Sequence, residues 1–234
     1  MKNIYKFENI SVERSGKLNE KLRDKTLMEE NIVFVAKALA KFEMDREIMK
    51  NAFDVTSLQQ SFQEVQRCGV FAEELLGVKY QNAINESVGI STSFLNNMRL
   101  TLNERTITGR MRNGHGHLDS YHLYLNDNLI ISGLDEDKTR QTDVICEIAH
   151  LGGDLDYYNL TEEDEIFFKI FCKEFGEDVN EITRSLYVYY KLFHVNSNII
   201  KLIDETTIYN YPEKKEERLE KLFRLFFRYL EIIE

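Results

Sequence analysis

The sequence predicts a mainly α-helical fold, formed as a single compact bundle of several helices. The 234 residues include one proline and 11 glycines, which are too few for the many turns of an all-β fold. Hydrophobic residues make up 43% of the chain, enough for a sizeable core. Neither a repeat, a low-complexity tract nor a flexible linker interrupts the sequence. We therefore expect one helical domain over residues 1–234.

The first half of the chain contains three helical patterns after an uncertain start. Ile4, Phe7, Ile10 and Val12 alternate with polar residues, which is typical of a short strand or an ordered arm. Apolar residues then recur at helical spacing over about 28–51. A second helix is expected from about Ser57, where Ser57 and Gln60 form a capping box, to Gly77. A more polar third helix is expected over about 80–103.

In the second half, two apolar runs flank Asn126–Asn128, so that residues 121–132 form either a hairpin or a helix end followed by a strand. A modest helical stripe over about 135–150 stops at Gly152 and Gly153. Thr161 and Asp164 are expected to cap the next helix, which ends near Gly176. Two more helices are predicted over about 180–203 and, after Pro212, over about 214–234.

The terminal helix over about 214–234 has an apolar surface wider than one stripe, with Leu225, Phe227 and Ile232 outside the main row. This surface is covered either by the same chain or by a partner, and we expect a homodimer. The formal charge of −10 argues against an unspecific grip on nucleic acid. No signal peptide or membrane span is apparent, so we expect a cytoplasmic protein with no membrane partner. Cys68, Cys146 and Cys172 are too far apart to indicate a zinc ribbon or a redox pair.

Residues 110–122, RMRNGHGHLDSYH, form the strongest candidate site, within an expected loop over about 108–122. The run from Arg112 and Asn113 to His117 resembles the R-polar-x-x-x-H motif of the HEPN superfamily, in its abortive-infection variety. The resemblance implies a dimeric helical bundle that cleaves RNA without a metal or other cofactor, in a defence or toxin system. It further implies that Arg112 binds the scissile phosphate, His117 moves the proton and Asn113 orients them. His115 is a second candidate acid or base, and Arg110 a candidate substrate-binding residue.

Two other functions are open at this stage. His115, His117, Asp119 and His122 have the alternating spacing of a metal site, with His150 and Asp154 as distant ligands, which would indicate a metal-dependent hydrolase. An acidic phage or mobile-element inhibitor would instead bind a host or defence enzyme, imitating phosphate with carboxylates such as Glu162–Glu165. The histidines can also be polar residues of a surface loop without a function.

Overall fold

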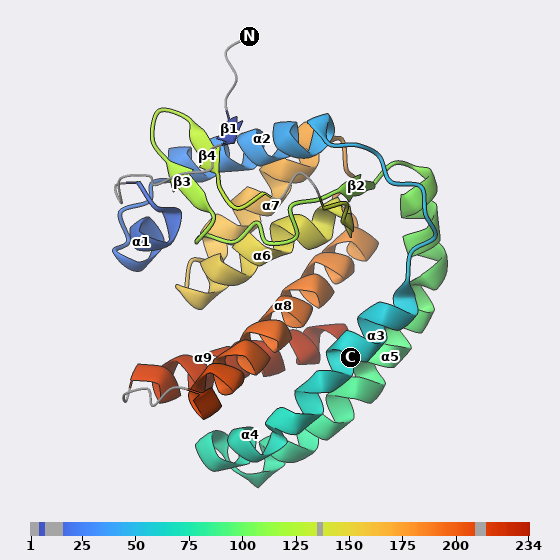
Figure 1. The fold of residues 1–234 in the computed structure, drawn as a ribbon, viewed down its shortest axis with the longest axis vertical. Coiled ribbons are helices and arrows are strands. Elements are labelled where there is room, and N and C mark those ends of the chain that lie inside the picture. The colour runs from blue at the N-terminus through green and yellow to red at the C-terminus, as the bar shows by residue number, and fades with distance from the viewer. Residues whose placement is uncertain (1–4, 8–15, 135–137, 209–213) are drawn as a thin grey trace. The chain divides into compact units, whose positions relative to one another are not determined.

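The structure is a computed structural model that describes residues 5–7, 16–134, 138–208 and 214–234 (Figure 1). Helices make up 71% of these residues, which confirms the mainly α-helical prediction. The elements in chain order are β1 (Tyr5–Phe7), α1 (Leu18–Arg23), α2 (Glu29–Asp45), α3 (Val55–Gln63), the 3₁₀ helix η1 (Glu64–Cys68), α4 (Gly69–Leu76), α5 (Val78–Ile107), β2 (Met111–Asn113), β3 (Leu123–Leu125), β4 (Leu129–Ile131), β5 (Gln141–Asp143), α6 (Val144–Tyr157), α7 (Thr161–Phe175), α8 (Glu181–Ile208) and α9 (Lys214–Ile233).

The chain divides into two compact units, and each unit is discontinuous in sequence. Unit 1 is formed by residues 1–51 and 105–187, and unit 2 by residues 52–104 and 188–234. One boundary follows α2, but the other two fall inside the continuous helices α5 and α8. The sequence has no linker at these points, so its pattern contains no sign of the division. That the whole chain acts as one domain stays a prediction.

Unit 1 combines packed helices with two small sheets. Helix α2 packs against α7, and α6 packs against α7 as well (Figure 1). Strands β3 and β4 pair antiparallel, so that of the two alternatives for residues 121–132 the structure has the hairpin. Strand β1 adds to β4 in parallel, whereas β2 pairs with β5 in a separate antiparallel sheet. The other positions of the predicted N-terminal strand or arm, Ile4, Ile10 and Val12, lie outside the described residues.

Several predicted helix ends differ from the structure. Helix α3 is capped by Asp54, whose side chain accepts from the Ser57 backbone, so Ser57 is not the N-cap. Helix α7 has no side-chain cap, because its N-cap residue is Leu160 and not Thr161. Asp164 accepts from the buried Tyr187 hydroxyl at 2.5 Å. Helix α6 runs on through Gly152 to Tyr157. A Cβ at Gly152 would meet Tyr187 and Asp164, so this glycine permits close packing and does not end the helix.

Unit 2 has an aromatic core built from helices α3, α5, α8 and α9. Tyr189 stacks on Phe94 with ring centroids 4.6 Å apart and on Phe62 at 6.3 Å. Its hydroxyl lies 2.9 Å from the Ser91 hydroxyl, so the buried polar group is satisfied. Asn196 donates to the Phe62 carbonyl at 3.0 Å.

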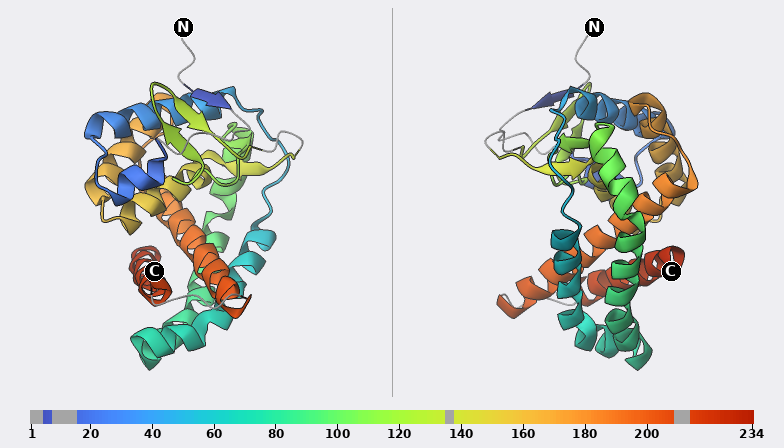
Figure 2. Two further views of the ribbon diagram at one scale, coloured as in Figure 1. Left: turned by 60° about the vertical axis from the view of Figure 1, so that its left-hand side comes forward. Right: turned by 90° about the vertical axis from the view of Figure 1, so that its right-hand side faces the viewer.

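Helix α9 begins at Lys214, within the range predicted for the terminal helix. Figure 2 shows it from two further directions, and it packs on α4 within unit 2. Leu225 and Phe227 are buried within the chain, whereas Ile232 is 62% exposed. The same chain therefore covers most of the wide apolar surface, and the homodimer stays a prediction. In the described ranges, no helix combines the length and apolarity that crossing a bilayer requires.

Candidate functional site

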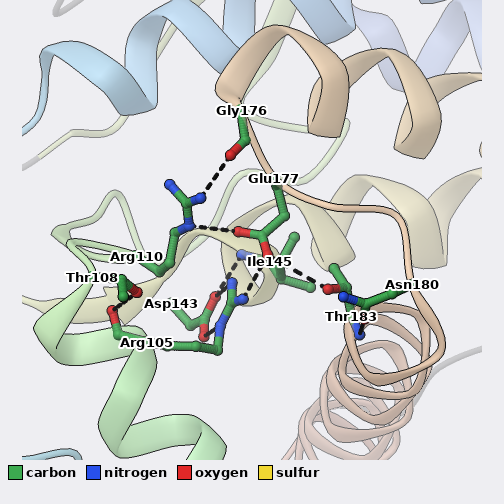
Figure 3. A network of polar contacts seen from close by, with 9 residues as sticks. All are labelled: Arg105, Thr108, Arg110, Asp143, Ile145, Gly176, Glu177, Asn180 and Thr183. Atoms are coloured by element: carbon green, nitrogen blue, oxygen red, sulfur yellow. Dashed lines mark hydrogen bonds and ion pairs between the residues drawn. The ribbon is translucent and has the colours of Figure 1, made fainter.

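A buried ion-pair network fixes the segment that leads into the predicted site (Figure 3). Arg105, near the end of α5, binds both carboxylate oxygens of Asp143 at 2.6 and 2.8 Å, and Glu177 at 2.8 Å. Asp143 also accepts from the Ile145 backbone and so caps α6. Arg110 pairs with the same Glu177 at 2.8 Å and donates to the Gly176 carbonyl. Strand β2 and the start of α6 are thereby held together.

Residues 114–122, which we call the histidine loop, follow β2 and are anchored from several directions. The Gly116 backbone donates to Glu147 at 2.8 Å, and the Ser120 backbone donates to Asp154 at 2.7 Å. Both carboxylates belong to α6. The Arg140 guanidinium donates to the His115 carbonyl at 2.7 Å. This loop is therefore a fixed segment on α6, with few backbone groups left to water.

His115 is part of the framework of the loop. Its ring is 1% exposed, and Nε2 lies 2.8 Å from the Ser132 carbonyl, to which it must donate. Nδ1 then carries no proton and accepts from the His117 backbone at 3.2 Å. Burial lowers the pKa of this histidine to about 4. A buried neutral ring with both nitrogens engaged positions the loop, and the predicted role as a second acid or base stays without structural support.

The four histidines of unit 1 gather at one place, because the buried His115 ring also lies 5.5 Å from the His122 ring, measured between centroids. The His117 ring lies 6.2 Å from the His122 ring and 5.7 Å from the His150 ring, measured between centroids. His117 is exposed, and His122 and His150 are half-buried. His122 Nδ1 is 2.7 Å from Asp119. Burial alone would raise the pKa of Asp119, but the bond to His122 and the backbone donors of Tyr121 and His122 lower it.

The predicted arginine and histidine pair is not brought together. Arg112 donates to the Arg46 carbonyl at 3.0 Å, and its guanidinium lies over the Phe175 ring at 5.6 Å. His117 instead faces the rings of His122 and His150. The Asn113 side chain accepts from the Arg140 backbone, so it fixes the loop entry. Arg110, the predicted substrate-binding residue, is engaged by Glu177 and Gly176.

Sequence reasoning did not assign Glu147 and Asp154 to the support of the loop, nor did it single out Glu43, which interacts electrostatically with Glu147. Glu43 and Glu147 are fully buried, and burial together with their mutual repulsion raises the pKa of Glu43. Burial raises the pKa of Glu147 to about 7 and that of Asp154 to about 7. One sequence signal could have identified Glu147 as a buried acid. It lies between Val144 and Leu151 at helical spacing, on an otherwise apolar stripe of the helix.

The set proposed from sequence as a metal site has partly assembled. His117, His122 and Asp119 lie close together, and His150 joins them from α6. The His115 ring lies 5.5 Å from the His122 ring, but both of its nitrogens are engaged by backbone groups. Across the residues that the structure describes, no group of three or more His, Cys, Asp or Glu side chains is arranged to hold a metal ion.

Comparison with known proteins identifies a fold. No protein-family model matches the sequence, and no curated protein matches it either. Among solved structures, the chain is similar to a choline/ethanolamine kinase family protein from Mesorhizobium loti, with a TM-score of 0.58 and 13% sequence identity. The match covers 94% of this chain and 69% of the other. At this identity the likeness shows a kinase-like fold.

The prediction of a metal-independent, HEPN-type ribonuclease is wrong, because the fold resembles that of a kinase family protein. The physical cause of the error is local. The spacing from Arg112 to His117 matches the motif, but their side chains have different surroundings. The two alternatives, an inhibitor of a nucleic-acid enzyme and a metal-dependent hydrolase, are not supported by this fold either.

Proposed function

We propose that this chain is a kinase-like protein that binds a small-molecule ligand at the histidine loop and does not carry out magnesium-dependent phosphoryl transfer. One observation carries the proposal. The catalytic loop of protein kinases has the pattern H-R-D-L-x-x-x-N, in which Asp accepts the proton of the substrate hydroxyl and Asn holds magnesium. The histidine loop reads H-G-H-L-x-x-x-H from His115 to His122. It keeps the His and the Leu and has imidazoles in both functional positions, 117 and 122.

The burial of the loop residues distinguishes the positions that match the kinase pattern from those that differ. The retained residues, His115 and Leu118, are 1% and 0% exposed and belong to the framework. His117 is exposed and His122 half-buried, so the altered positions are those that a ligand can reach. A loop that had lost all function would not need a framework of four anchoring hydrogen bonds from Glu147, Asp154, Arg140 and Ser132.

The nucleotide and magnesium ions that a kinase uses do not fit the residues present. Magnesium prefers oxygen ligands in octahedral geometry, and an imidazole supplies none. His122 Nδ1 is moreover engaged by Asp119. The 234 residues contain neither a G-x-G-x-x-G phosphate loop nor a D-F-G segment, which kinases use for phosphates and metal. We therefore derive no transfer step for this chain.

The test uses the purified full chain with ATP, magnesium and either choline or ethanolamine, the alcohols named for the structural neighbour. Phosphorus NMR is expected to show no transfer above a protein-free blank. The same compounds and their phosphate esters are then screened by thermal shift, because a ligand that binds the folded state raises its stability. At least one is expected to raise the melting temperature of the native chain.

The matched variants are His117→Gln and, on the exposed β3–β4 turn, Asp127→Asn. His117→Gln should abolish the thermal shift, whereas Asp127→Asn should keep it. Phosphoryl transfer that disappears in His117→Gln would overturn the proposal, since His117 would then act as a catalytic base. A screen without any stabilising compound would overturn the binding function.

A further inference from the structure

We infer that the histidine loop binds the phosphate group of its ligand directly, through His117 and His150, without a metal ion. This inference rests on the proposed function and names the chemical class of the ligand. It starts from the histidine cluster itself. His117 comes from the loop and His150 from α6, and their ring centroids are 5.7 Å apart at an edge-to-face angle of 63°. Two imidazoles from different elements thus lie edge to face, the one exposed and the other half-buried.

Imidazoles in place of the Asp and Asn of the kinase pattern change how the site can bind phosphate. A kinase site presents a carboxylate and an amide, so its phosphates are bound through magnesium ions that neutralise the charge. Imidazole has no fixed negative charge and its ring N–H groups donate hydrogen bonds to anions. At position 117 an imidazole stands where a kinase has its carboxylate, so His117 and His150 together need no cation between themselves and a phosphate.

The charges around the cluster agree with an anionic ligand. Asp119 is a carboxylate within the cluster, and its Oδ1 is occupied by His122 and by the backbone of Tyr121 and His122. Asp154 accepts from the Ser120 backbone, and burial raises its pKa to about 7, so its negative charge is reduced at neutral pH.

The guanidinium of Arg140 lies against the loop backbone at Gly116. A Cβ at Gly116, the residue before His117, would come 2.7 Å from Arg140 Nη1, so Arg140 packs on the loop backbone there. One of its N–H groups donates to the His115 carbonyl, and an arginine has five such donors in all. Phosphate is an anion that guanidinium and imidazole both recognise. This places a permanent positive charge beside the residue before His117, although Arg140 also interacts with Glu147 and lowers the pKa of that carboxyl.

The experiment titrates the full chain with inorganic phosphate and with pyrophosphate in EDTA, and follows ¹⁵N-labelled histidine side chains by NMR. The resonances of His117 and His150 are expected to shift with saturation, and EDTA is expected to have no effect. His117→Gln and His150→Gln should each weaken binding roughly tenfold or more, the loss expected for a charge-assisted hydrogen bond. Asp127→Asn should bind like the native chain.

The outcomes separate this inference from the proposed function. Binding that appears only with added magnesium, or that survives both histidine variants, overturns the inference. So does a chain that binds neither phosphate nor pyrophosphate. If choline or ethanolamine still binds in a way that needs His117, the proposed function stands while the inference fails. Transfer of phosphate from ATP that depends on His117 overturns the proposed function itself.

Discussion

Glu147→Gln should make the protein more stable at pH 8 and leave its stability nearly unchanged at pH 4.5. Glu147 is fully buried, and burial raises its pKa from 4.5 to about 7. The folded state therefore binds a proton more tightly than the unfolded state, so stability falls as the pH rises from 4.5 to 7. A difference of 2.5 pKa units corresponds to about 3 kcal/mol above pH 7.

Glutamine keeps an oxygen that can accept from the Gly116 backbone, which now donates to Glu147 at 2.8 Å. Because this bond already contributes to the pKa of about 7, the expected gain at pH 8 is the full amount, about 3 kcal/mol. Urea unfolding of both proteins between pH 4.5 and 8 measures this difference directly. Titrating groups that do not interact with Glu147 cancel in the comparison, whereas Glu43, which Glu147 repels, does not.

The variant Glu43→Gln tests the same repulsion from the other carboxylate of the pair. Glu43 and Glu147 repel each other in the interior, while Arg46 and Arg112 lower the pKa of Glu43. Removing either charge relieves the same repulsion, so the double variant should gain less than the sum of the two single variants. Parallel stability curves for Glu147→Gln and the native chain across this pH range would refute the reasoning.

Three further predictions concern stability. His115→Ala should cost about 2–4 kcal/mol in urea unfolding at pH 8, because it removes two internal hydrogen bonds and leaves a cavity; a loss under about 1 kcal/mol would mean that the ring is not structural. Arg105→Leu should cost about 3–5 kcal/mol in the same assay, since it leaves the buried carboxylate of Asp143 unpaired; an unchanged midpoint would contradict this. Asp204→Asn, which breaks an exposed pair with Arg67, should change thermal unfolding by less than about 1 kcal/mol, and a larger loss would show that exposure does not screen the pair.

The sequence allowed local structure to be predicted better than arrangement. Apolar spacing located most helices, and the two apolar runs around Asn126–Asn128 indicated the hairpin, because both signals depend on neighbours along the chain. The boundaries of unit 1 and unit 2 inside α5 and α8 were not predictable, since no change of composition marks them. The kinase-like fold is likewise a property of how the helices pack, which periodicity does not encode.

The candidate site shows the same limit. The density of histidines singled out residues 110–122, and His150, which was included as a distant ligand, lies next to His117 in the structure. The role of each ring could not be predicted, because it depends on contacts such as the Ser132 carbonyl on His115. Arg112 was assigned to phosphate on spacing alone, whereas Phe175 and the Arg46 carbonyl, which are far away in sequence, determine where it lies.

The discontinuity of the two units has a consequence for how the chain acquires its structure during synthesis. Residues 1–51 cannot complete unit 1 until residues 105–187 have been made, and residues 52–104 leave the ribosome in between. Helix α2 must therefore wait for α7, against which it packs, with its apolar face exposed to water. Contacts so distant in sequence slow folding and lengthen the time during which apolar surface is open to aggregation. The N-terminal segment is thus where a chaperone would be needed first.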